Sequence, residues 1–105
     1  MAKLTNLEEL NLDGTRIADL SPLRDLVKLK SLYLSRVPAG DVSQLAGLVN
    51  MEYLVLRGTK VRDVSGLANM TKLRVLGLDG TPVTDEDVAK LGAMLPKCRI
   101  DRLRP

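Results

Sequence analysis

The stretch "MEYLVLRGTKVRDVSGL", residues 51–67, combines two patterns that together decide the fold. In its first part Leu54 and Leu56 alternate with other residues, which is typical of a short strand that is buried on one side. Gly58 and Thr59 follow, and residues of these types favour a tight turn. The remaining "VRDVSGL" brings apolar side chains back toward the same side. The stretch therefore predicts a strand, a turn and a return segment that share one apolar side.

This pattern recurs along the chain every 22 residues without a gap. Four apolar series show it: Leu4, Leu26, Leu48 and Met70; Leu7, Leu29, Met51, Leu73 and Leu95; Leu10, Leu32, Leu54, Leu76 and Cys98; Leu12, Leu34, Leu56, Leu78 and Ile100. One such unit cannot bury its apolar side alone, whereas stacked units share a continuous core. We therefore predict one domain over residues 1–105, made of four 22-residue repeats from about residue 4 and a C-terminal closing strand.

The four strand-and-turn segments are "LEELNLDGTRI", "LKSLYLSRV", "MEYLVLRGTKV" and "LRVLGLDGTPV". Each resembles the L-x-x-L-x-L-x-x-N-x-L motif of the leucine-rich repeat family, and the repeat length and "DLSPL" resemble its internalin-like and SDS22-like types. The chain departs from the motif at the Asn position, which holds Thr15, Val37, Thr59 and Thr81. The resemblance implies an α/β solenoid with short parallel strands on the concave face and 3₁₀ or turn segments on the convex side. It also implies a binding module, without indicating which partner is bound.

The last unit differs from the others. Thr84 followed by Asp87 forms a capping-box pattern, and the apolar residues that follow lie on one helical face. We expect an α-helix over about 85–95. The first unit has no comparable closing element, because residues 1–5 are too short for a cap. This predicts either a fragment or small array without an N-terminal cap, or an open edge that meets another chain.

Three features suggest chemistry, and each has a structural explanation that we favour. Gly58-Thr59-Lys60 resembles part of a phosphate loop, but Gly-Thr recurs in register and lacks the order that a P-loop needs. A row of carboxylates suggests calcium, but the spacing Asp-x-Ser is also typical of turn capping; the row is Asp19, Asp41, Asp63 and Asp85. Cys98 has no His to activate it and lies in the register of buried leucines, so we expect it in the core.

The unit "SRVPAGDV", residues 35–42, is the irregular one. Val37 replaces the turn Thr and Ala39 replaces the larger inward residue, with Pro38 between them. Local repacking explains these changes, and a loop displaced beside a binding site is the alternative.

Composition narrows the possible functions. The chain has no His, which removes the commonest general base and metal ligand, so we predict no enzyme activity, cofactor or metal. The net charge of +3 comes largely from the tail "KCRIDRLRP", and its basic residues are not interleaved with aromatics, so nucleic-acid binding is disfavoured. No apolar run reaches the length of a membrane span and no signal-peptide core is present, which is more typical of a cytoplasmic chain.

The repeat register predicts which residues face outward from the strands, on a surface that we call the strand face. Its predicted rows are Glu9, Ser31, Tyr53, Val75 and Lys97; Asn11, Tyr33, Val55, Gly77 and Arg99; Asp13, Ser35, Arg57, Asp79 and Asp101; and, at the edge, Gly14, Arg36, Gly58, Gly80 and Arg102. This layout gives the face an acidic N-terminal end and a basic C-terminal end. It also gathers both tyrosines of the chain beside two valines and two arginines.

Tyr and Arg are the residues most often found as binding hot spots, although Tyr and Val also simply suit strands. We therefore predict a protein-binding site at Tyr33, Tyr53, Val55, Val75, Arg36 and Arg57. The sequence favours a non-enzymatic protein-binding module whose partner is a protein of unknown identity. Self-association through the N-terminal edge or the strand face is a further expectation. The alternatives are a recognition segment of a larger multidomain protein or effector, and a structural or engineered scaffold without a ligand of its own.

Overall fold

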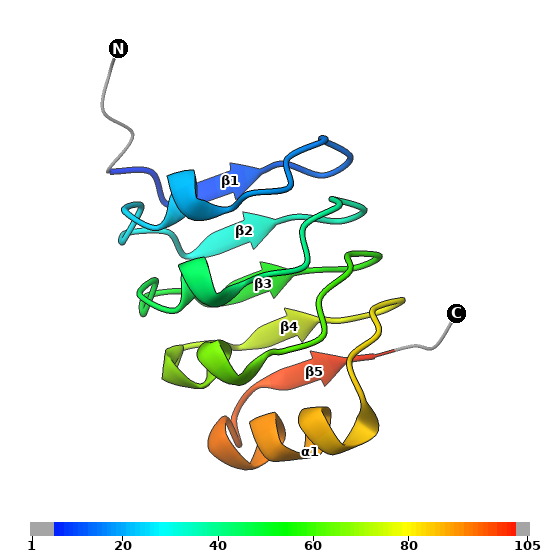
Figure 1. Cartoon of the computed structure of the whole chain (residues 1–105). Helices are drawn as coiled ribbons and strands as arrows, with labels where there is room; N and C mark the ends of the chain where they lie inside the picture. The colour runs from blue at the N-terminus through cyan, green and yellow to red at the C-terminus, as the bar shows by residue number, and fades with distance from the viewer. Residues whose placement is uncertain (1–5, 103–105) are drawn as a thin grey trace.

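The computed structural model describes residues 6–102, which form one parallel sheet backed by short helices (Figure 1). Its strands follow each other in chain order, and each has three residues: β1 (Glu9–Asn11), β2 (Ser31–Tyr33), β3 (Tyr53–Val55), β4 (Val75–Gly77) and β5 (Arg99–Asp101). Neighbouring strands pair in parallel throughout. Parallel pairing requires a crossover after every strand, and the return segments supply it.

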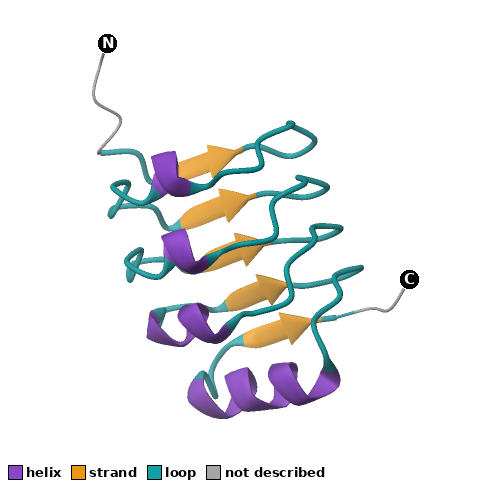
Figure 2. Cartoon of the chain, in the orientation of Figure 1, coloured by secondary structure: helices purple, strands orange, loops and turns teal. Residues whose placement is uncertain are grey.

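The return segments lie on the side opposite the strands (Figure 2). Three of them carry a 3₁₀ helix, namely η1 (Ser21–Leu23), η2 (Ser43–Leu45) and η3 (Ser65–Asn69), and the fourth carries α1 (Asp85–Met94). The predicted solenoid of parallel strands, short convex turns and one C-terminal α-helix is confirmed. The helix is one residue shorter than the predicted range of 85–95.

The core lies between the strands and the return segments. The middle residues of three strands, Leu32, Leu54 and Leu76, have no exposed surface, and the residues beside them in each strand point outward. Each buried leucine contributes about 1.5–3 kcal/mol relative to an exposed one. Alternation along each strand therefore fixes which side chains reach the surface.

The turns after the strands use Gly and Thr as the sequence predicts. Gly14, Gly58 and Gly80 adopt φ of 73°, 67° and 72°, a left-handed conformation that glycine adopts without strain. The hydroxyl of Thr59 donates to the carbonyl of Leu56 over 2.8 Å, and Thr15 and Thr81 form the same bond in their own units. The Gly-Thr pairs are therefore turn scaffold.

Aspartates begin the 3₁₀ helices, as the capping interpretation predicts. The amides of Ser21, Ser43 and Ser65 each donate to the carboxylate two residues earlier, over 2.9 Å in every case. Asp85, the fourth member of the predicted row, behaves differently because an α-helix follows it. Thr84 caps α1 by accepting from the amide of Asp87 over 3.1 Å, and Asp85 pairs with the guanidinium of Arg102.

The predicted register of the last strand is wrong by two residues. Val75 pairs with Arg99 and Leu76 with Ile100, so the last step is 24 residues where the earlier steps are 22. The extra residues form a turn after α1, in which the amide of Cys98 donates to the carbonyl of Leu95 over 3.0 Å. Pro96 occupies the second position of this turn, where its fixed φ is favourable.

This shift corrects three predictions. Ile100, and not Cys98, continues the inward leucine series, and Cys98 is half-buried where the sequence predicts a buried residue. Lys97 lies in the turn and not on the strand face. Arg99 and Asp101 take the outward positions of β5 and pair with each other over 2.9 Å.

The predicted basic end of the strand face is therefore largely neutralised. Arg99 is paired with Asp101, and Arg102 is engaged by Asp85 and by the carbonyl of Val83. Arg104 lies outside the described residues. The irregular unit shows local repacking, because Val37 and Ala39 are both buried and the carbonyl of Ala39 accepts from the amide of Lys60 over 3.2 Å.

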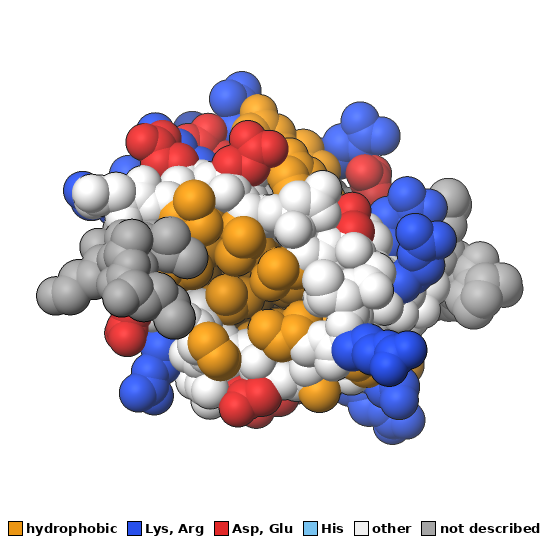
Figure 3. Space-filling model, turned by 90° about the horizontal axis from the view of Figure 1, so that it is seen from above, with side chains coloured by type: hydrophobic (Ala, Val, Ile, Leu, Met, Phe, Trp, Pro, Cys, Tyr) orange, Lys and Arg blue, Asp and Glu red, His pale blue; other side chains and the backbone are white. Residues whose placement is uncertain are grey.

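The β1 end of the stack exposes apolar surface. Figure 3 looks down on this end and shows hydrophobic side chains gathered at its centre. Leu7, Leu10, Leu12 and Ile17 are only partly buried there, whereas Leu29, Leu32 and Leu34, which occupy the same positions one repeat later, are fully buried. The difference arises because no described unit packs above β1.

Candidate functional site

The structure places the six predicted binding residues on three adjacent strands and the turns that follow them. Tyr33 pairs directly with Val55, and Tyr53 pairs directly with Val75, so two aromatic–valine pairs lie side by side across β2, β3 and β4. Adjacent strands lie about 4.8 Å apart, so these side chains form one continuous surface. We call these four residues with Arg36 and Arg57 the tyrosine patch.

The tyrosine patch is accessible to a partner. Tyr53 has 37% of its surface exposed, Arg36 and Arg57 are exposed, and the other three side chains are half-buried. Half-buried aromatic and aliphatic side chains keep their orientation while still offering apolar surface. The patch can therefore bury apolar area against another molecule without a large loss of side-chain freedom.

Gly77 adds an outward strand position without a side chain beside the patch, which the sequence analysis did not single out. A Cβ atom at Gly77 would lie 3.4 Å from Cγ1 of Val55 and 3.7 Å from Cγ of Arg57. These two side chains therefore lean over the glycine, which is itself buried. The sequence carried a signal for this feature, because Gly77 interrupts a row of larger outward residues.

Arg57 is held by an ion pair. Its Nε lies 3.7 Å from Oδ2 of Asp79, and 64% of the Arg57 side chain is exposed. A solvent-exposed pair of this length contributes little to stability, about 0–1 kcal/mol. Its main consequence is that the charge of Arg57 is already opposed by a neighbouring carboxylate.

Arg36 has an unusual backbone conformation that sequence reasoning missed. It has φ of 60°, and it is the one residue other than glycine with a positive φ in the described part of the chain. The signal was present in the predicted rows, because Arg36 stands in a column whose other members are Gly14, Gly58 and Gly80.

The capping carboxylates of the convex side are ionised structural groups. The backbone hydrogen bond from Ser21 lowers the pKa of Asp19, and the backbone hydrogen bond from Ser65 does the same for Asp63. For Asp41, the side-chain hydrogen bond from Ser43 is the largest influence and again lowers the pKa. Within residues 6–102, no three His, Cys, Asp or Glu side chains are grouped so that they could hold a metal ion.

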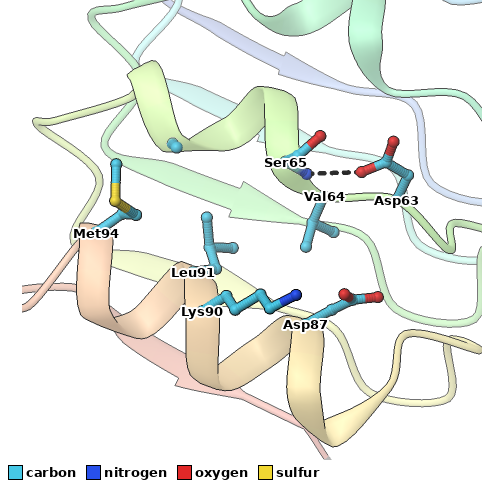
Figure 4. A pocket seen from close by; sticks show the side chains of 8 residues that line it. Asp63, Val64, Ser65, Asp87, Lys90, Leu91 and Met94 are labelled. Carbon is cyan, nitrogen blue, oxygen red and sulfur yellow. Dashed lines mark hydrogen bonds between the residues drawn. The ribbon is translucent and has the colours of Figure 1, made fainter.

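A groove lies on the convex side between η3 and α1, with a volume of about 280 Å³. Figure 4 shows Val64 and Leu91 inside it, Met94 at one end, and Asp63 and Asp87 at the other. The dashed bond from the Ser65 amide to Asp63 shows that this carboxylate already serves as a cap. Most of the exposed lining is apolar and comes from Val64, Ala68, Leu91 and Met94.

Cys98 is a poor nucleophile in its position. Burial raises the pKa of the Cys98 thiol, and the nearby charge of Asp101 adds to this rise. The reactive form of cysteine is the thiolate, so a raised pKa lowers its population at neutral pH.

Of the described helices, none is long and apolar enough to cross a membrane.

Comparisons with known proteins agree with this geometry. The family model described as leucine-rich repeats in two copies matches residues 5–47. No curated protein sequence matches the chain significantly. An internalin (inlF) of Listeria monocytogenes superposes with a TM-score of 0.89 at 26% identity, over 96% of this chain and 29% of that one. Internalin C2 of the same organism gives a TM-score of 0.86 at 33% identity, over 97% of this chain and 46% of that one.

A more distant likeness extends to another organism. A leucine-rich repeat protein of Leptospira interrogans gives a TM-score of 0.60 at 20% identity, over 93% of this chain and 38% of that one, and likeness at this identity shows the fold alone. The chain spans less than half the length of each of these three solved structures. The regular repeat, the parallel strands with their 3₁₀ returns and these likenesses lead to one conclusion: the chain is a leucine-rich repeat solenoid, and its structure is similar to those of the internalins.

Proposed function

We propose that the chain is a non-enzymatic protein-binding module that uses the tyrosine patch on its strand face. The observation that carries this proposal is the position of the aromatic residues. The chain has two, Tyr33 and Tyr53, and both face outward on adjacent strands, each paired with a valine. Protein binding is also typical of leucine-rich repeat proteins, which supports this function over the others.

The physical basis of binding is apolar contact supported by nearby charge. A Tyr side chain supplies a large rigid surface with a polar end, and such residues dominate measured interface energies. The rigid ladder of parallel strands holds the patch in one arrangement, so little ordering is required on association. The partner is a protein or peptide that places apolar side chains against β2, β3 and β4.

A binding selection tests this proposal. Phage displaying random peptides are selected on the immobilised chain, and the affinities of the recovered peptides are measured by titration. We expect the double substitution Tyr33→Ser/Tyr53→Ser to weaken these peptides roughly tenfold or more. The matched control is Val27→Ser/Val49→Ser, because both valines are 47% exposed and lie in turns outside the strands. Equal losses in the two double variants would contradict the proposal.

Two alternatives concern what the module serves, and the same peptide selection distinguishes between them. The chain can be the recognition segment of a larger multidomain protein or effector, in which case selected peptides still bind the tyrosine patch. A scaffold without a ligand of its own predicts instead that no recovered peptide depends on Tyr33 or Tyr53.

Self-association is a second candidate function, and the exposed apolar end of the stack favours it. Leu7, Leu10 and Leu12 are only partly buried beside the edge of β1 that pairs with no strand of the described residues. Pairing of that edge with another copy would cover them. Sedimentation equilibrium over a range of concentrations tests this: we expect the mean mass to rise with concentration and Leu10→Asp to abolish the rise. A mass that stays monomeric at the highest concentration would exclude it.

A further inference from the structure

Arg36 occupies a position whose backbone is built for glycine. The equivalent residues in the other turns are Gly14, Gly58 and Gly80, with φ between 67° and 73°, and Arg36 adopts 60°. The same ladder of backbone bonds holds these turns, because the amides of Arg36 and Gly58 donate to the carbonyls of Arg57 and Asp79 over 2.6 and 2.8 Å. The fold therefore imposes the left-handed conformation, and Arg36 adopts it with a strain that glycine avoids.

The neighbouring turn makes room for the Arg36 side chain. A Cβ atom at Gly58 would lie 3.2 Å from Cγ of Arg36, which is closer than side chains normally pack. The arginine stem therefore lies against the bare backbone of Gly58. The other neighbour in its column, Gly14, also has no side chain, so the guanidinium is not crowded from either side.

The charge of Arg36 is available to a ligand. Its side chain is exposed and forms no ion pair within residues 6–102. The carboxylate of Asp13, in the adjacent row, accepts from the amide of Ser35 over 2.7 Å, and Asp79 is paired with Arg57. Arg36 is therefore the cation of the tyrosine patch that forms no ion pair with a carboxylate of the described residues.

Strained residues persist where the surrounding structure fixes them, and they cluster at binding sites. We propose that Arg36 is a specificity-determining residue that binds a carboxylate of the partner, so that the tyrosine patch selects acidic peptides with an aromatic or aliphatic side chain next to the Asp or Glu. This inference rests on the proposed function. Arginine suits the role because its planar fork forms two hydrogen bonds to one carboxylate.

The test uses the same phage-displayed random peptides selected on the unaltered chain. We expect recovered sequences to be enriched in Asp or Glu beside an apolar residue. We expect Arg36→Gly to weaken these peptides roughly tenfold or more, because a charged hydrogen bond is lost. Arg36→Lys should recover part of the affinity, since it restores the charge without the fork. The control Arg62→Ala removes an exposed arginine of a return segment and should leave the affinity unchanged.

Arg36→Asn guards against misfolding, because Asn tolerates the left-handed conformation and carries no charge. The same loss in Arg36→Asn and Arg36→Gly supports the inference. Peptides that depend on Tyr33 and Tyr53, but are not acidic and bind Arg36→Gly equally well, would overturn the role of Arg36 and leave the proposed function standing. Peptides that depend on neither tyrosine would overturn both.

Discussion

At the scale of single residues, alternation along a three-residue strand decides most of the molecule. The outward positions of Tyr33, Tyr53, Val55 and Val75 could be predicted, because successive side chains of a strand point to opposite faces. The conformation of Arg36 could not be predicted in the same way. An apolar pattern indicates which residues are buried but not their φ angles. The left-handed turn at Arg36 can be inferred only from the glycines at the equivalent positions of the other repeats.

The strain at Arg36 predicts that glycine is more stable than alanine at this position, which is the reverse of the usual order. Arg36→Gly should be about 1 kcal/mol more stable than Arg36→Ala, since alanine keeps the left-handed strain and glycine relieves it. The measurement is urea-induced unfolding of both variants. Ala46 serves as the control because it has φ of −59°, and there Ala46→Gly should lose about 0.5–1 kcal/mol. An Arg36→Ala variant at least as stable as Arg36→Gly would contradict the account.

The Gly58 position predicts a second, steric effect. Gly58→Ala should lower the free energy of unfolding by about 1–2 kcal/mol. The alanine backbone would have to adopt a left-handed φ, and its Cβ atom would lie too close to Cγ of Arg36. Gly47→Ala is the matched control, since Gly47 lies outside the left-handed region and has no atom within 4 Å. Thermal unfolding should show little loss for Gly47→Ala. Similar losses at both glycines would argue against a special role for this turn.

At the scale of elements, the sequence predicted α1 but not the register of β5. The capping pattern of Thr84 and Asp87 predicts where the helix starts. The 22-residue spacing of the apolar residues continues as far as Leu95. The two extra residues that follow leave the alternation intact, because Cys98 and Ile100 are both apolar and two positions apart. A shift of two keeps every side chain on its own face, so periodicity alone could not detect it.

Arg102 joins the end of β5 to the start of α1, which predicts a measurable role in stability. Its side chain is only 17% exposed and donates to the carbonyl of Val83 and to Asp85. Arg102→Gln should lower the free energy of unfolding by about 1–3 kcal/mol, since partly buried acceptors lose a charged donor. Arg99→Gln is the control, because its pair with Asp101 is exposed and should contribute at most about 1 kcal/mol. Unfolding in guanidinium chloride compares the two variants, and equal losses would contradict this role of Arg102.

The capping aspartates predict how stability depends on pH. Hydrogen bonds lower the folded-state pKa values of Asp19, Asp41 and Asp63, so their contribution is complete above the unfolded carboxyl pKa of about 3.9. It is lost as the pH falls through the lowered folded values. Urea midpoints measured between neutral and acidic pH should therefore decline at the acidic end. Asn at all three positions keeps an acceptor without a titrating group, and an unchanged acid decline in that variant would contradict this origin.

At the scale of the whole molecule, the repeat determined the architecture and left the partner open. Every unit contributes one strand and one return segment, so the stack, the core and the strand face could be predicted from a single period. The open edge near β1, where leucines are partly exposed, could also be predicted. The register of β5 and the contact of Arg102 with Val83 could not, because both depart from the 22-residue period. The tyrosine patch lies in the middle of the stack, on β2, β3 and β4 and the turns that follow β2 and β3.

The most direct test of the central claim is to map where a selected peptide binds. Amide chemical shifts of the isotope-labelled chain are recorded by NMR while a peptide recovered from the random library is titrated in. We expect the largest changes to cluster at Tyr33, Arg36, Tyr53, Val55 and Val75. Changes gathered instead along the groove between η3 and α1, or around Leu7 and Leu10 at the β1 end, would contradict it.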